Sequence, residues 1–173
     1  VNLVTCGGQS SIPMISEIKK NFNINYFELV SAISSKSAGY GTRQNVDEYI
    51  NNTKQAILKT CKLKNTKIIF NLNPSEPPVT MTNSMFFKVN NKINSSNKKK
   101  ILKAILKVNT FMQKIISGYH AKFVDIIDNN IIKITISITG QGDYLPKYSG
   151  NLDIITSIGV NYAKKISEKK YFN

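Results

Sequence analysis

The sequence predicts an α+β domain in which a mixed or antiparallel sheet carries its helices on one face. Short apolar runs typical of strands alternate with longer segments whose apolar residues recur at helical spacing. In the segment 131–138 the even-numbered positions are all isoleucine, whereas Lys133, Thr135 and Ser137 point the other way, so one face of the sheet is buried. The 173 residues, 41% of them hydrophobic, suffice for one sizeable core, and we expect residues 1–173 to form a single domain.

The N-terminal elements follow from local patterns. A strand is expected at 2–5, followed by a helix over 12–20 that begins at one of the serines 10 and 11. Pro13 lies in the first turn of that helix, where its missing N–H costs nothing. The apolar run 26–33 predicts a second strand.

The middle of the chain predicts a helix between strands. Asn45 is the expected helix cap, with Glu48 three residues later as in a capping box. The apolar stripe of this helix consists of Val46, Ile50, Thr53 and Ile57. The segment 67–72 predicts a strand that ends at NPSEPP, because neither a helix nor a central strand continues through such a stretch, and 85–89 predicts another.

The last third predicts two helices and a hairpin. The basic segment 97–107 opens a helix whose buried stripe is Ile101, Ile105, Val108, Met112 and Ile115. The strands 121–127 and 131–138 are joined by the turn pair Asn129-Asn130. The final helix covers 152–170, and its expected inner stripe is Ile155, Ile158, Tyr162 and Ile166.

The formal net charge of +14 at pH 7 raises the question of a nucleic-acid partner, because clustered Lys and Arg neutralise phosphates. The lysines are instead spread along the whole chain and accompany many asparagines and isoleucines, a composition that an AT-rich coding bias produces. The densest basic run, 97–107, has the pattern of a core-facing helix with a solvated basic face. We therefore expect no nucleic-acid partner.

Two cysteines and one histidine indicate neither a disulfide framework nor a zinc site, so we expect no bound metal and a reducing, cytoplasmic compartment. No apolar run approaches the roughly 18 residues that a membrane helix requires, and no signal peptide is recognisable, so no membrane association is expected. The chain starts with Val1, and an apolar strand-like run follows at once. We expect it to be cut from a longer protein.

Cys6 stands in the stretch VTCGGQSSIP, between a predicted strand and a predicted helix. Backbone N–H groups and the positive end of a helix dipole at such a junction favour the thiolate, and the same donors can receive the oxyanion of a tetrahedral adduct. Gly7 and Gly8 leave room for a substrate or cofactor. The residues fit equally well a buried cysteine before a glycine turn. Cys61 has no comparable surroundings and is assigned no role.

Two further stretches, SISSKSAGYGTRQN and GDYLPKYSGNLD, are rich in small and polar residues. The first combines a Gly-x-Gly and an arginine directly before a helix, an arrangement that leaves backbone N–H groups available to an anionic or amide-bearing ligand. A flexible linker rich in serine and glycine has a similar composition, so this stretch alone does not define a site.

Together, four stretches resemble the acylating (CoA-acetylating) acetaldehyde dehydrogenases, which act in aromatic-hydrocarbon catabolism beside 4-hydroxy-2-oxovalerate aldolase. They are VNLVTCGGQSSIPM, SISSKSAGYGTRQNVDEY, NPSEPP and DYLPKYSGNLDI, and they follow the family's order from residue 1 to about residue 160. The resemblance implies a glyceraldehyde-3-phosphate-dehydrogenase-like enzyme with an N-terminal Rossmann domain and a C-terminal substrate and dimerisation domain. This chain resembles the second domain, and the Rossmann NAD-binding domain is expected to be missing from it.

The resemblance also implies roles for individual residues. Cys6 matches the nucleophile that attacks the aldehyde carbonyl to give a thiohemiacetal; hydride transfer to NAD then leaves an acyl-thioester, which coenzyme A resolves to acetyl-CoA. Asn151 matches a contact near the nicotinamide. The remaining matches to NAD contacts form one segment: Ser37, Ala38, Gly39, Tyr40, Gly41, Thr42, Arg43, Gln44 and Asn45. The family further implies a homodimer and an aldolase partner.

The sequence departs from the family pattern in several places. Tyr40 stands where the family usually has proline, and Asn83 stands where it typically has an aspartate that is a candidate for polarising the thiol. An amide cannot act as a base. The segment 128–131 is shorter than in the family. His120 matches no catalytic residue of the family, and we expect a structural or exposed role for it.

The sequence contains no GxGxxG-type fingerprint, which in a Rossmann domain holds the pyrophosphate of a dinucleotide. We therefore expect the isolated chain to fold but to be inactive or nearly so. The alternative is a non-catalytic dimerisation or partner-docking module derived from the same family. Asn83 favours that alternative, and the intact TCGG stretch opposes it.

Overall fold

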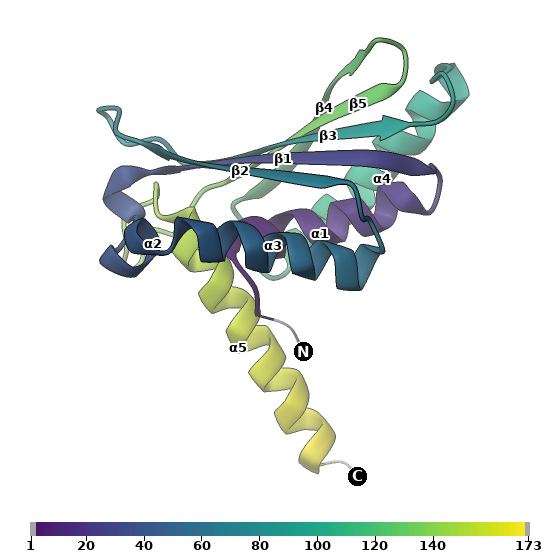
Figure 1. The fold of residues 1–173 in the computed structure, drawn as a ribbon. Coiled ribbons are helices and arrows are strands. Elements are labelled where there is room, and N and C mark those ends of the chain that lie inside the picture. The colour runs from purple at the N-terminus through teal and green to yellow at the C-terminus, as the bar shows by residue number, and fades with distance from the viewer. Residues whose placement is uncertain (1–2, 172–173) are drawn as a thin grey trace.

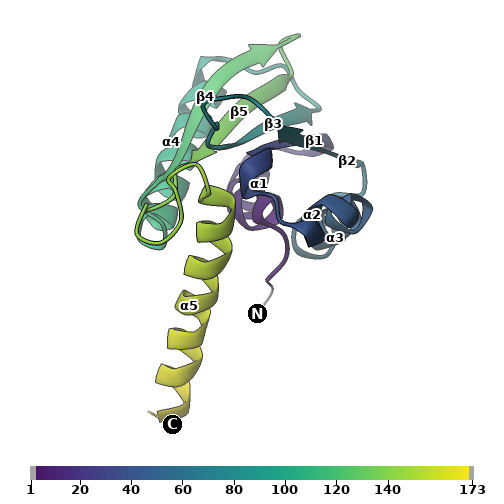
Figure 2. The same cartoon turned by 90° about the vertical axis from the view of Figure 1, so that its left-hand side faces the viewer.

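The computed structural model describes residues 3–171, with the side chains of residues 3–168. It contains one five-stranded mixed sheet with helices on one face (Figures 1 and 2), which confirms the predicted α+β class. The strands are β1 (Ile24–Ser34), β2 (Thr66–Asn73), β3 (Met81–Val89), β4 (Tyr119–Ile127) and β5 (Ile131–Ile138). The helices are α1 (Cys6–Lys19), α2 (Tyr40–Gln44), α3 (Val46–Cys61), α4 (Ser95–Gln113) and α5 (Gly150–Tyr171).

The sheet has the strand order β2-β1-β3-β5-β4. β1 and β2 are parallel and α3 lies in the crossover between them, whereas the other neighbouring pairs are antiparallel. As a result β1, β2 and β5 run in the same direction. Their carboxyl ends lie at one edge of the sheet together with the amino end of β3, in the left half of Figure 1, where α2 and the start of α5 are also found.

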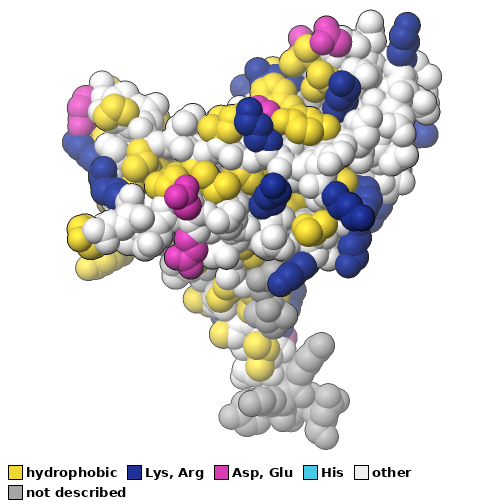
Figure 3. Space-filling view, viewed as in Figure 1, with side chains coloured by type: hydrophobic (Ala, Val, Ile, Leu, Met, Phe, Trp, Pro, Cys, Tyr) yellow, Lys and Arg dark blue, Asp and Glu magenta, His cyan; other side chains and the backbone are white. Residues whose placement is uncertain are grey.

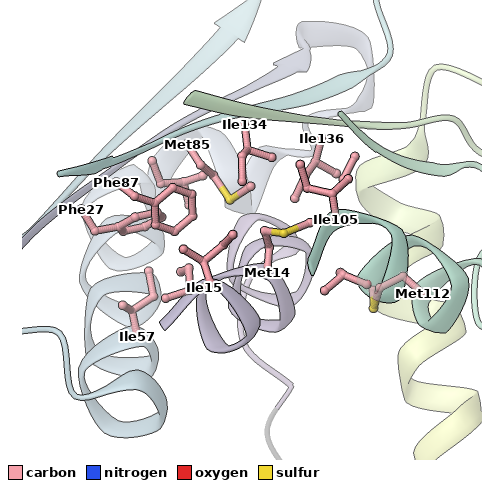
Figure 4. Close-up of a cluster of buried hydrophobic side chains, with 14 of the residues drawn as sticks. Met14, Ile15, Phe27, Ile57, Met85, Phe87, Ile105, Met112, Ile134 and Ile136 are labelled. Carbon is pink, nitrogen blue, oxygen red and sulfur yellow. The ribbon is translucent and has the colours of Figure 1, made fainter. Parts of the chain in front are cut away.

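The hydrophobic core lies between the sheet and its helices. The four even-numbered isoleucines of β5 are fully buried, which confirms the predicted two-faced strand. Met14 and Ile15 of α1 pack at the centre of this layer (Figure 4). Phe27 and Phe87, which are partners across β1 and β3, place their ring centroids 4.9 Å apart. Helix α1 is therefore held by apolar burial along much of its length.

Two predictions for the N-terminal segment are wrong. The strand expected at 2–5 is absent from its described part, residues 3–5, and residue 2 lies outside the described residues. The helix begins at Cys6, earlier than predicted, because Thr5 caps it: Thr5 Oγ1 accepts a hydrogen bond from the N–H of Gly8 at 3.0 Å. Pro13 therefore lies inside the helix instead of in its first turn.

Two smaller differences concern local geometry. The hairpin turn between β4 and β5 uses positive φ at Asp128 (48°) and Asn129 (59°), one residue earlier than predicted. Asn45 lies at the N-cap position of α3 as expected, but its side chain donates to the carbonyl of Gly41 and caps nothing. The remaining strands and helices are found where the sequence predicts them, with ends shifted by a few residues.

Helix α5 projects away from the rest of the fold (Figure 2). Ile154 and Ile158 in its first half are buried, whereas Ile166, which was predicted to face inward, is 44% exposed because the helix has left the body of the domain there. Among the described residues, no helix has the length and apolarity needed to cross a membrane. Lysine and arginine side chains are distributed over several elements on the face that Figure 3 shows.

Candidate active site

The stretches singled out in the sequence meet at one edge of the sheet. The segment 35–45 follows the carboxyl end of β1, the loop 74–80 follows that of β2, and α5 starts shortly after that of β5. Helix α1 runs back beneath β1 after the short connection 20–23, and its first turn lies against Ser31 of β1 and Asn83 of β3. Because β1 ends at Ser34, Cys6 lies near the edge that the other stretches follow, beneath the last third of the strand.

Cys6 is the first residue of α1, and its nearest backbone donors already have protein partners. The N–H of Gly7 donates to Tyr49 Oη at 3.1 Å, and the N–H of Gly8 donates to Thr5 Oγ1 at 3.0 Å. The next N–H, that of Gln9, donates to the carbonyl of Thr5 at 2.8 Å. The expectation that the Gly-Gly donors receive an oxyanion is therefore wrong for this conformation.

The thiol of Cys6 is half-buried and packs against the hydrophobic core. Burial raises its pKa from an ordinary value of 9.0 to about 11, although the Tyr49 hydroxyl and the backbone N–H groups of Gly7 and Cys6 act in the opposite direction. The sequence left two alternatives, a junction that favours the thiolate and a buried cysteine, and the desolvation of Cys6 supports the second. The Tyr49 hydroxyl and the two N–H groups lie next to the sulfur and favour its ionised form.

The first turn of α1 is fastened to α3 by side chains. Thr53 Oγ1 donates to the carbonyl of Tyr49 at 2.7 Å, and the hydroxyl of Thr5 lies 2.6 Å from that of Thr53. Tyr49 packs its ring on Phe70 of β2, with centroids 4.2 Å apart. The position of Cys6 is thus fixed through the residue before it, Thr5, and the residue after it, Gly7, both of which are bonded to side chains of α3.

Asn83, on the buried face of β3, reaches the same turn from the sheet. Its side-chain nitrogen donates a short hydrogen bond to Ser10 Oγ. The Ser10 hydroxyl in turn donates to the carbonyl of Cys6 at 2.8 Å and lies 3.0 Å from that of Gly7. Asn83 is therefore linked to the backbone carbonyl of Cys6 through the Ser10 hydroxyl. The amide of Asn83 donates the hydrogen bond to Ser10, whereas an aspartate at this position would accept one.

The predicted cofactor segment forms a bend that meets the start of α5. The guanidinium of Arg43 donates to the carbonyls of Ala38 (3.2 Å) and Ser35 (2.6 Å), which holds the bend closed. Asn151 Nδ2 donates to the carbonyl of Ser37 at 3.2 Å. The structure thus brings together two residues that the sequence assigned to the same ligand from distant parts of the chain.

Comparisons with known proteins agree with this geometry. Residues 6–146 match the sequence family described as prokaryotic acetaldehyde dehydrogenase, dimerisation. The chain belongs to this family. Curated acetaldehyde dehydrogenases from Geobacillus stearothermophilus and Carboxydothermus hydrogenoformans are each 41% identical to it, over 98% of the chain and over 57% and 55% of their own lengths. The chain therefore spans just over half the length of these relatives.

A solved structure shows the fold at greater distance. Aspartate semialdehyde dehydrogenase II from Vibrio cholerae, solved as a complex with ASA, superposes with a TM-score of 0.56 at 10% identity, over 92% of this chain and 57% of that one. This likeness confirms the α+β fold that the sequence predicts.

Buried polar atoms without partners concentrate around the site of this acetaldehyde dehydrogenase family member. Buried polar groups in proteins are nearly always hydrogen-bonded, so each exception is informative. Within the described part of the chain three buried side-chain atoms have no hydrogen-bond partner: Ser11 Oγ, Asn83 Oδ1 and Asn151 Oδ1. Ser31 Oγ, the strand partner of Asn83, has the Tyr49 hydroxyl as its neighbour, and Asn151 lies beside Ser37.

Several predicted cofactor residues are open to solvent. Gly39, Tyr40, Gly41, Gln44 and Asn45 are exposed, Tyr40 by 75%, whereas Ser37 and Ala38 are buried. Helix α2, which contains most of the exposed ones, therefore forms the outer wall of the bend. His120 is exposed on β4, as expected from its sequence context.

Tyr49 is the site residue that sequence reasoning missed. Its hydroxyl lies 3.8 Å from Cys6 Sγ. The signal available in the sequence was its position four residues before Thr53 in the predicted helix, which places both side chains on one face.

Proposed function

We propose that this chain is the substrate and dimerisation part of an acylating acetaldehyde dehydrogenase, which converts acetaldehyde, coenzyme A and NAD to acetyl-CoA and NADH. The observation that carries the proposal is the position of Cys6, half-buried at the start of α1 beside the Tyr49 hydroxyl, in a chain whose Ser37 and Asn151 bond to each other. Family membership supports the reaction class, because the curated relatives are named acetaldehyde dehydrogenase.

Cys6 supplies the nucleophile in this proposal. The thiol loses its proton, and the sulfur attacks the aldehyde carbon to form a thiohemiacetal. Loss of the carbonyl hydrogen as hydride and of the hydroxyl proton leaves an acyl-thioester on Cys6. The thiol of coenzyme A attacks that thioester, takes the acyl group and restores the Cys6 thiol. A thioester is suited to this step because one thiol displaces another.

NAD supplies the hydride acceptor when it is bound. The residues at the bend are suited to contact one part of NAD, the nicotinamide. Asn151 Oδ1 is a buried acceptor without a partner among the described side chains, and the carboxamide of a nicotinamide carries the N–H donor that would satisfy it. The hydrogen bond to Ser37 orients the Asn151 amide with that oxygen pointing away. We propose that the segment 37–45 contacts NAD and that a separate Rossmann domain holds the pyrophosphate, in line with the share of the relatives that this chain covers.

A homodimer is part of the proposal because the description of the matched family names dimerisation. The sheet offers a surface for dimer formation: its helix-free face carries partly exposed apolar residues, among them Val30, Ile69 and Phe86.

A reducing compartment such as the cytoplasm keeps Cys6 as a thiol. The aldolase partner that the resemblance implies stays a prediction.

A non-catalytic dimerisation or docking module is the second candidate. Two observations favour it: burial holds the pKa of Cys6 near 11, and Asn83 cannot serve as a base for the thiol.

Acyl exchange with acetyl-CoA separates the two candidates, because this half-reaction requires no NAD. The chain is incubated with acetyl-CoA over a pH series, and the acetylated peptides are mapped by mass spectrometry. The enzymatic proposal expects acetylation of Cys6 that accelerates toward about pH 11 and persists in Cys61→Ala. Cys6→Ala abolishes it. Absence of acetyl-Cys6 at every pH favours the non-catalytic module.

A further inference from the structure

Tyr49 touches the candidate nucleophile from a different helix. It lies in the first turn of α3, and its hydroxyl oxygen is 3.8 Å from Cys6 Sγ, within reach of a weak sulfur hydrogen bond. The same oxygen accepts the N–H of Gly7 at 3.1 Å. The O–H proton of this phenol can point at Cys6 Sγ or at its other neighbour, Ser31 Oγ, whose hydrogen bond lowers the pKa of Tyr49.

The absence of a side chain at Gly7 makes this approach possible. A Cβ at that position would lie 2.7 Å from Ser31 Oγ and closer still to Tyr49 Oη. The phenol therefore occupies the space directly over the first peptide of α1. Its ring is fixed on the other side by Phe70. The contact with the sulfur is thus set by packing on two elements and requires no movement of Tyr49.

The protonation states of the two groups suit a donor and an acceptor. Burial, and after it the charge of an ionised Cys6, raise the pKa of Tyr49 well above its usual range, which favours a protonated phenol beside a thiolate. The Tyr49 hydroxyl lowers the pKa of Cys6 against the larger effect of burial. Once the thiol proton has left, the O–H of Tyr49 can point at the thiolate.

We propose that Tyr49 is a second catalytic residue of this chain, whose hydroxyl donates a hydrogen bond to the ionised sulfur of Cys6 and stabilises it for attack. The role of Tyr49 in catalysis rests on the function proposed above. The hydrogen bond by which Tyr49 stabilises the thiolate does not depend on that function. A purely structural Tyr49 would support Gly7 and pack on Phe70 without influencing the ionisation of the sulfur.

The test measures the alkylation of Cys6 by iodoacetamide in the full chain over a pH series, with peptide mapping by mass spectrometry. Tyr49→Phe keeps the ring and removes the hydroxyl. Its Cys6 profile is expected to move to higher pH by about one unit, so that alkylation below the midpoint slows about ten-fold. The Cys61 profile in the same samples serves as an internal reference and is expected not to move.

Thr53→Val is the matched control, because it cuts the neighbouring bridge between α1 and α3 and leaves the phenol in place. Its Cys6 profile is expected to coincide with that of the parent chain. An unchanged or faster Cys6 in Tyr49→Phe overturns the proposal, and so does an equal shift in Thr53→Val, which would assign the effect to loosening of the helix.

A second variant keeps the proposal falsifiable if Tyr49→Phe fails to fold. Site-specific 3-fluorotyrosine at position 49 retains the ring and the Gly7 contact and has a more acidic, stronger donor. The expected shift of the Cys6 profile is then to lower pH, and a shift to higher pH contradicts the proposal. If Cys6 does not exchange an acetyl group with acetyl-CoA, the enzymatic function is refuted, but the alkylation profiles stay the same. The proposed function and the proposed hydrogen bond from Tyr49 can therefore fail independently.

Discussion

The side chain of Asn151 donates a hydrogen bond to the backbone carbonyl of Ser37, 3.2 Å away and 114 residues earlier in the chain. Both residues are buried, and the amide oxygen of Asn151 has no partner among the described residues. The nitrogen of the amide therefore has a structural role, whereas its oxygen is buried without a partner among the described residues. This division predicts that the two ends respond differently to substitution.

Asn151→Asp replaces the donor by an acceptor against the Ser37 carbonyl. We expect the free energy of unfolding at neutral pH to fall by about 3 kcal/mol, because a buried carboxylate then opposes a carbonyl. The loss should shrink as the pH falls, since the protonated carboxyl can donate to Ser37 again. Urea unfolding at several pH values measures both effects. A deficit that stays constant down to acidic pH would contradict the assigned hydrogen bond.

Ser10 and Ser11 are adjacent and equally buried, but only the Ser10 hydroxyl has hydrogen-bond partners among the described residues. Ser10→Ala removes the acceptor of Asn83 and the hydroxyl bonded to the Cys6 carbonyl, so the free energy of unfolding should fall by about 2 kcal/mol. Ser11→Ala removes an oxygen without a partner in the described structure, so its effect should be close to zero or stabilising. Urea denaturation of both variants gives the comparison. Equal losses would show that the Asn83 contact is not the cause.

Gly7→Ala should destabilise the chain although alanine favours helices. The added Cβ would meet Tyr49 Oη and Ser31 Oγ, and overpacking of this kind costs about 2 kcal/mol. Gly159→Ala, in α5, is the matched control: its Cβ meets only ordinary contact at 3.9 Å, and a gain of about 0.5 kcal/mol is expected. The midpoints of thermal unfolding report both. A neutral Gly7→Ala would mean that the phenol is not held over the first turn.

The Cys6 thiol makes stability depend on alkaline pH. Its pKa is 9.0 ordinarily and about 11 in the folded chain, so between these values the unfolded chain binds fewer protons and stability falls as pH rises. This contribution is fully present below pH 9 and is lost as the pH rises through about 11, and it amounts to about 3 kcal/mol. Cys6→Ala should flatten that part of the curve of unfolding free energy against pH. Parallel curves for the two proteins would show that Cys6 is not desolvated.

The elements that the sequence predicted well are those in which burial follows a local period. The isoleucines of β5 alternate because one face of the strand meets the helices, whereas β1 was located from its apolar run. The start of α1 was misplaced because Val4 and Thr5 are β-branched and the glycines after Cys6 are weak helix formers. Thr5 caps the helix, and packing of α1 in the core outweighs those propensities.

The candidate site was only partly accessible from the sequence. Cys6, Ser37 and Asn151 came from a family resemblance, and of these the structure joins Ser37 and Asn151 by a hydrogen bond. The pKa of Cys6 could not be predicted, because it depends on desolvation by elements far along the chain. The contact between Tyr49 and Cys6 joins residues 43 positions apart through the packing of α1 on α3, and no local pattern encodes it.

The hairpin turn at Asp128 and Asn129 lies at the end of the sheet opposite to the one that holds Cys6. Both of its flanking strands are anchored in the ladder, and the turn itself contributes nothing to the bend or to the first turn of α1. Extra residues grafted there would lengthen a connector at the end of the sheet away from Cys6, provided that the carbonyls of Asn129 and Asn130 keep their bonds to the N–H groups of Ile93 and Val89. This turn is therefore a suitable place to attach a fluorophore or an affinity tag to the chain.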